Sequence, residues 1–165
     1  MANDDVLKGK KILIVDDEID VLELLEDLLD ECDTETASTF EDAKTLLEQN
    51  PYDVAILDIM GVAGFDLLKQ TTAKGFPTVM LTAHAMTSES LTKAAKLGAV
   101  SFLPKEKIME LQSFLEDIIL GSGKPVWKKL FDRLAPYFRK RFGWSPEEEK
   151  DVVTELQGLD EIEKK

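Results

Sequence analysis

The chain has 165 residues, of which 44% are hydrophobic and 32% charged, and its formal net charge is −13 at pH 7. This length suits one ordinary domain with an appendage, and the composition is that of a globular protein with a packed core. The acidic charge argues against nucleic-acid binding by the body of the chain, and no apolar stretch approaches the length of a membrane span. The single cysteine excludes an internal disulfide, and the polar N-terminus lacks the apolar centre of a secretory signal, so we expect a cytoplasmic protein.

Short apolar runs alternate with helical patterns along the first 120 residues. The expected strands cover residues 11–15, 34–37, 52–57, 77–81 and 100–103. The expected helices cover residues 18–31, 40–49, 65–74, 88–97 and 107–120. Thr39 is predicted to cap the second helix and Gly98 to close the fourth. The strict alternation predicts an α/β fold, a doubly wound sheet of five parallel strands with helices on both faces.

Two of the predicted strands end in carboxylates. The run Ile12–Val15 leads into Asp16 and Asp17, and the run Val54–Leu57 leads into Asp58. The carboxyl ends of parallel strands share one edge of the sheet, so three acids would meet there and repel one another unless a cation or protons relieve them. Clustered ionised oxygens suit a hard divalent ion, and we therefore expect Mg²⁺.

Two further strands bring a hydroxyl and an ammonium group to the same edge. Thr82 follows the fourth strand, and Lys105 follows the fifth. The lysine and the threonine can meet an anion that the same metal binds. Carboxylates, a hydroxyl and an ammonium group together suit phosphoryl transfer, in which the metal and cationic groups neutralise charge on the equatorial oxygens. An aspartate at this place can itself be the nucleophile and form an aspartyl phosphate.

Four segments resemble the receiver domain of bacterial response regulators, the chemotaxis-regulator-like phosphoacceptor half of two-component signalling. These segments are ILIVDDE at 12–18, DVAILDIM at 53–60, LTAHA at 81–85 and GAVSFLPK at 98–105. Their order, spacing and strand-end placement agree with that family over about three quarters of the chain. The resemblance implies a receiver domain over residues 8–121, with the flavodoxin-like strand order 2-1-3-4-5.

The resemblance also implies a metal site. Asp17 and Asp58 match direct Mg²⁺ ligands, and Asp16 matches the acid that holds the ion mainly through water. The backbone carbonyl of Met60 matches a further ligand.

The same resemblance implies a signalling role rather than that of an enzyme. Asp58 matches the phosphoacceptor, which takes its phosphoryl group from a sensor histidine kinase or a phosphotransfer protein. Thr82 and Lys105 match the hydroxyl and the lysine that contact that group, and Phe102 matches an aromatic switch that responds to the threonine. The switched surface would lie near the fourth helix and the fifth strand and helix.

Two other functions remain open from the sequence. The loop after Asp58 is two residues shorter than the family's usual loop and lacks its proline, which leaves room for a phosphorylation-independent receiver-like scaffold or interaction protein. A phosphatase-like hydrolase with an aspartyl nucleophile is disfavoured, because the second acid of such enzymes is replaced here by Met60.

The composition changes at the Gly-Ser-Gly sequence of residues 121–123. Residues 1–120 carry a net charge of −14 and residues 121–165 a net charge of +1. We expect residues 124–165 to form a helical extension of two helices. Pro136 would kink or split the first of these. Ser145 would cap the second in a capping box with Glu148, and Gly158 would end it.

About forty residues form little independent core, so the apolar stripe of this extension must bury against something. We favour docking on the receiver, which would give a regulated surface, or on a partner subunit, which would give a homodimer. An effector protein is the other partner expected for residues 124–165. Binding to a membrane surface or a partner's groove comes next. Nucleic-acid binding is least favoured, because no complete DNA-binding module is found.

Overall fold

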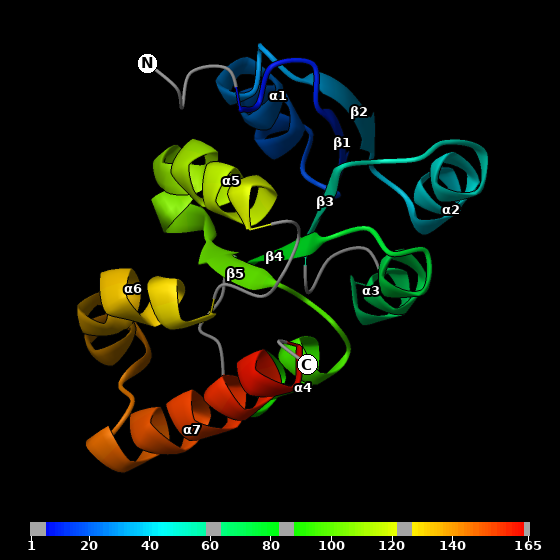
Figure 1. Ribbon diagram of the computed structural model, residues 1–165. Coiled ribbons are helices and arrows are strands. Elements are labelled where there is room, and N and C mark those ends of the chain that lie inside the picture. The colour runs from blue at the N-terminus through cyan, green and yellow to red at the C-terminus, as the bar shows by residue number, and fades with distance from the viewer. Residues whose placement is uncertain (1–5, 59–63, 83–87, 122–126, 164–165) are drawn as a thin grey trace.

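The computed structural model describes residues 6–58, 64–82, 88–121 and 127–163. Strands and helices alternate through the first three quarters of the chain (Figure 1). The strands are β1 (Lys11–Val15), β2 (Asp33–Ala37), β3 (Val54–Asp58), β4 (Thr78–Thr82) and β5 (Ser101–Pro104). The helices between and after them are α1 (Ile19–Leu28), α2 (Phe40–Gln49), α3 (Gly64–Ala73), α4 (Ser88–Lys96) and α5 (Leu111–Leu120). A 3₁₀ helix, η2 (Lys105–Glu110), takes the place of the first predicted turn of α5.

The five strands form one parallel sheet in the order β2-β1-β3-β4-β5, which confirms the predicted fold class and strand order. In the register, Val15 lies beside Leu57, Asp58 beside Leu81, and Thr82 beside Pro104. The carboxyl ends of β1, β3, β4 and β5 therefore lie along a single edge of the sheet.

Burial explains why the central strands are mainly apolar rather than alternating. Every residue of β3, β4 and β5 is buried, because helices cover both faces of a parallel sheet.

Two predicted signals at helix ends are also present in the structure. The Thr39 hydroxyl accepts a hydrogen bond from the Asp42 N–H at 3.1 Å, and Gly98 follows α4 with a φ of +113°. The predicted helix cap at Thr39 and the glycine turn after α4 are both confirmed.

Two more helices follow the sheet, α6 (Trp127–Phe142) and α7 (Pro146–Glu163). In Figure 1, α6 lies beside β5 and α7 runs along α4, and α6 contacts β5 while α7 contacts both α4 and α6. The predicted capping box is present, since the Ser145 hydroxyl accepts from the Glu148 N–H at 3.1 Å. None of the described helices is long and apolar enough to cross a membrane.

One expectation about these helices is wrong, and another is decided only in part. The sequence predicts that Pro136 kinks or splits the first helix; it is not split, because α6 runs through Pro136, and a kink there stays a prediction. Proline removes one backbone hydrogen bond at a cost of about 3 kcal/mol, and the buried side chains of Leu134 and Phe138 on either side offset that cost. Gly158 does not end α7, which continues to Glu163. A glycine costs a helix only about 1 kcal/mol, which a long helix tolerates.

Candidate functional site

Three polar residues of the predicted site are buried at the carboxyl ends of strands. Asp16 directly follows β1, Asp58 ends β3 and Thr82 ends β4, with exposed fractions of 0%, 5% and 2%. Asp16 is held by the backbone, because its Oδ1 accepts a hydrogen bond of 2.9 Å from the N–H of Glu18. Buried polar groups need such partners, so this strand edge is built to hold charge.

Lys105 joins these strand ends. Its Nζ lies 2.7 Å from Asp16 Oδ2, 3.2 Å from Glu18 Oε1 and 3.8 Å from Asp58 Oδ1. Its side chain is only 11% exposed. One ammonium group, supplied by the residue after β5, thus makes ion pairs with acids from the ends of β1 and β3.

The pKa values reflect this crowding. Burial raises the pKa of Asp16, and the hydrogen bonds from Lys105 and from the Glu18 N–H oppose that rise. Burial by itself would lower the pKa of Lys105, but the ion pair with Asp16 and the charge of Asp58 outweigh it, so the pKa is raised overall. Lys105 is therefore held in its cationic form, in which it can neutralise an anion.

The acids also suit a metal ion. Asp16, Asp17 and Glu18 each offer a carboxylate oxygen, and these oxygens lie within 4.8 Å of one another. Hard oxygen donors at this spacing fit Mg²⁺. The structure thus brings the predicted ligands Asp16 and Asp17 together, and Lys105 pairs with both Asp16 and the predicted ligand Asp58. The predicted ligand Met60 lies outside the described residues.

Glu18 is the part of this cluster that the sequence reasoning missed as a site residue. It is the third acid of the Asp-Asp-Glu run, and its position before α1 suggested only a favourable place at a helix N-terminus. Its ion pair with Lys105 joins residues 87 positions apart, and no local pattern reports that distance.

Thr82 and Phe102 lie on neighbouring strands. Thr82 is paired in register with Pro104, the residue before Lys105. Phe102 is fully buried in β5, and its ring centroid lies 5.6 Å from that of Phe138 in α6. The structure brings the threonine close to the lysine in the sheet, and it places the aromatic residue under the C-terminal extension.

Comparisons with known proteins agree with this geometry. The family model of the response regulator receiver domain matches residues 12–116. Response regulator protein PilR from Pseudomonas aeruginosa is 36% identical over 105 residues, which cover 60% of this chain and 23% of PilR. The chain thus spans about a quarter of the length of this curated relative.

Solved structures extend the likeness to the fold. A CheY-like receiver domain protein from Methanospirillum hungatei has a TM-score of 0.60 at 22% identity, covering 70% of this chain and 99% of that one. A response regulator structure from Chloroflexus aurantiacus has a TM-score of 0.59 at 29% identity, covering 69% and 99%. The chain belongs to the response regulator receiver domain family of two-component systems, whose members are signalling phosphoacceptors rather than conventional enzymes.

Proposed function

We propose that this chain is a response regulator in which Asp58 accepts a phosphoryl group from a sensor histidine kinase or a phosphotransfer protein. The observation that carries the proposal is the position of Lys105, whose Nζ lies 3.8 Å from Asp58 and 2.7 Å from Asp16. A cation fixed between the candidate acceptor and a second buried acid is suited to receive the oxygens of an incoming phosphate.

The proposed reaction is a phosphoryl transfer between two protein side chains. A carboxylate oxygen of Asp58 attacks phosphorus, the bond from phosphorus to the donor's histidine nitrogen breaks, and its electron pair stays on the imidazole. The product is an aspartyl phosphate. Lys105 neutralises the equatorial oxygens during the transfer, and the Thr82 hydroxyl donates a hydrogen bond to the phosphoryl group once it is in place.

Mg²⁺ would be held by Asp16, Asp17 and Asp58, with the carbonyl of Met60, and Glu18 is an additional candidate ligand. The observation that supports an ion here is that carboxylate oxygens of Asp16, Asp17 and Glu18 lie within 4.8 Å of one another. When bound, the ion supplies positive charge that screens the acids from one another and from the phosphate. Without it, Lys105 alone would offset the charge of several carboxylates.

The experiment is incubation with acetyl phosphate and Mg²⁺, followed by intact mass spectrometry. We expect one phosphate adduct that is lost in Asp58→Asn and in the presence of EDTA. Asp53→Asn is the matched control, because Asp53 lies at the amino ends of β1 and β3, opposite the site, where its carboxylate accepts a hydrogen bond from the Lys11 N–H. An adduct that persists in Asp58→Asn would refute the assignment of the acceptor.

A phosphorylation-independent scaffold is the second candidate function. Lys105 already neutralises Asp16 at 2.7 Å without a phosphate, and this observation favours a site that serves only stability. A failure to form any adduct with acetyl phosphate, phosphoramidate and a panel of histidine kinases would favour the scaffold.

A further inference from the structure

One segment of the chain, residues 102–110, touches both the acidic site and helix α6. Lys105 lies within this segment and pairs with Asp16 and Asp58 at the sheet edge. On both sides of Lys105, the same segment carries side chains that contact α6. The segment is called the 102–110 bridge below.

The first contact of the bridge is aromatic. Phe102 lies 5.6 Å from Phe138 between ring centroids, and Phe138 lies 5.5 Å from Trp144 on the far side. All three are buried, at 0%, 1% and 6% exposed. The three rings form a continuous row of contacts from β5 through α6 to the connection between α6 and α7, so a shift of Phe102 changes the packing of Trp144.

The next contacts lie in η2. Lys107 places its Nζ 5.0 Å from the centroid of the Tyr137 ring. Glu110 pairs with Arg133 at 3.1 Å, and the guanidinium of Arg133 also lies 4.4 Å over the ring of Phe114 in α5. Helix α6 thus contacts the 102–110 bridge at three places, one in β5 and two in η2, and Lys105 lies between the first contact and the other two.

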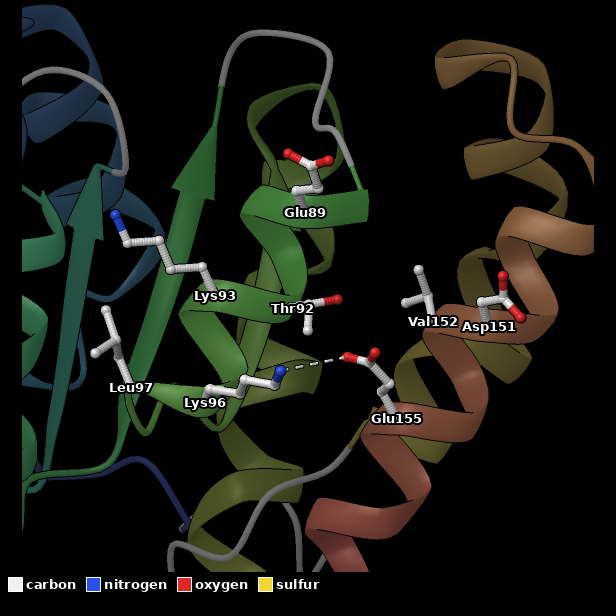
Figure 2. A pocket seen from close by; sticks show the side chains of 8 residues that line it. All are labelled: Glu89, Thr92, Lys93, Lys96, Leu97, Asp151, Val152 and Glu155. Atoms are coloured by element: carbon white, nitrogen blue, oxygen red, sulfur yellow. Dashed lines mark ion pairs between the residues drawn. The ribbon is translucent and has the colours of Figure 1, made fainter.

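Helix α7 packs against α4, and the two helices are also joined by an exposed ion pair. A cleft of about 460 Å³ lies between α4 and α7, and Figure 2 shows Lys96 reaching across it to Glu155. These two charges are 3.8 Å apart and are 63% and 51% exposed, so their contact contributes little. Val152 and Leu156 of α7 are buried, at 3% and 1% exposed, so apolar packing rather than this ion pair holds α7 in place.

We propose that the 102–110 bridge couples phosphoryl binding at Asp58 to the packing of α6 against β5 and η2. Helices α6 and α7 would then cover the β5 side of the receiver when the site is empty and release it when the site is occupied. This proposal rests on the proposed function for its natural trigger. Phosphoryl oxygens on Asp58 compete with Asp16 and Glu18 for Lys105. Phe102 is only three residues away, about 10 Å along an extended strand, so a shift of Lys105 is transmitted to the aromatic stack.

Linkage makes the coupling reciprocal. If occupancy of the Asp58 site raises the equilibrium constant for undocking of α6 by some factor, then undocking of α6 raises the affinity of the site by the same factor. The loss of one aromatic contact changes such an equilibrium by about twofold to tenfold. This is the size of effect that the experiment should find.

The first arm uses Trp144 as a reporter in a full-length Trp127→Phe protein, which then has one tryptophan. Acetyl phosphate and Mg²⁺ are added, adduct formation is followed by intact mass, and Trp144 is quenched with acrylamide. We expect the quenching constant to rise at least twofold with the adduct, and amide exchange in residues 127–142 to accelerate. An adduct with unchanged quenching and exchange would overturn the coupling while leaving the proposed function intact.

The second arm does not depend on phosphorylation. Lys105→Met removes the ammonium group from the acidic site and should by itself raise the quenching of Trp144. If no adduct forms in the first arm, the proposed function fails, and this variant alone decides the coupling. Unchanged quenching in a folded Lys105→Met protein would overturn it.

The third arm tests reciprocity with beryllium fluoride and Mg²⁺ as a phosphoryl mimic. Phe138→Leu, which keeps an apolar residue in the stack, should tighten the apparent affinity by about twofold to tenfold. Arg139→Gln is the matched control, since Arg139 lies on the same helix but pairs with Glu149 of α7 rather than with the receiver. Equal affinities in wild type and Phe138→Leu, or an equal shift in Arg139→Gln, would refute the bridge.

Discussion

The ion pairs of Lys105 predict a specific loss of stability when the charge is removed. Lys105→Met keeps most of the aliphatic stem but removes the cation that pairs with Asp16 and Asp58, which are 0% and 5% exposed. Removing one partner of a buried ion pair costs about 3–5 kcal/mol, because the remaining charge stays buried and unpaired. The edge of the sheet is partly open to water here, since Glu18 is exposed, so we expect about 3 kcal/mol.

The assays are urea unfolding and thermal unfolding, each followed by circular dichroism at pH 7 without divalent metal. A loss of about 3 kcal/mol corresponds to a fall in Tm of about 6–12 °C for a chain of this size. Lys96→Met is the control, because Lys96 is 63% exposed and its pair with Glu155 contributes about 0–1 kcal/mol.

The pH dependence of the Lys105→Met deficit has a definite sign. Burial raises the pKa of Asp16 even with Lys105 present, and loss of the lysine raises that pKa further. A carboxyl whose folded pKa is raised destabilises the fold as pH rises above its unfolded value near 4, so the deficit should be largest at pH 7 and shrink towards pH 4. Mg²⁺ at about 100 times its Kd should restore up to about 2.7 kcal/mol. A variant as stable as wild type at pH 7 in EDTA would refute the reasoning.

Three further predictions concern single positions. Gly98→Ala should lower stability by about 2 kcal/mol in thermal unfolding, because φ is +113° and an added Cβ would lie 2.5 Å from the Thr72 side chain; Gly9→Ala, with positive φ but open space, should cost less. Burial, with the charges of two neighbouring acids, raises the pKa of Cys32 to about 11, so its alkylation at pH 8.5 should be at least tenfold slower in the folded protein than in urea; equal rates would contradict this. Ser145→Ala should remove an N-cap and cost about 1 kcal/mol, with faster amide exchange in the first turn of α7; an unchanged exchange rate would show that the cap is not needed.

The features that were predictable from the sequence depend on neighbouring residues. A run such as Val54–Leu57 is apolar throughout because both faces of a parallel sheet are covered, and that burial is visible as composition. Caps at Thr39 and Ser145 involve residues three positions apart, so the pattern alone identifies them. The edge on which the acids meet followed from one topological rule, which places the ends of parallel strands together.

The features that were not predictable depend on distant contacts or on small energy differences. The pair of Lys105 with Glu18 joins residues 87 apart, and only the folded sheet brings them together. Whether Pro136 divides a helix depends on whether the packing of Leu134 and Phe138 outweighs a local penalty, and that balance is decided by the surface on which α6 lies. The division into domains and the roles of the individual site residues stay predictions.

The two outermost strands of the sheet explain why the extension packs where it does. An edge strand with unpaired backbone groups invites association unless charge or another element protects it. β2 is one edge, and its Asp33 and Glu35 are acids that remain partly or fully exposed. β5 is the other edge, and its Ser101–Pro104 sequence carries no charge and is entirely buried, so charge cannot protect it. Helix α6, which contacts β5 through Phe138, covers this second edge instead. Pro104 is the last residue of this apolar outer strand, and the next residue is Lys105 of the acidic site. Protection of this edge and the chemistry of the site therefore depend on the same few residues, which is the physical basis for coupling them.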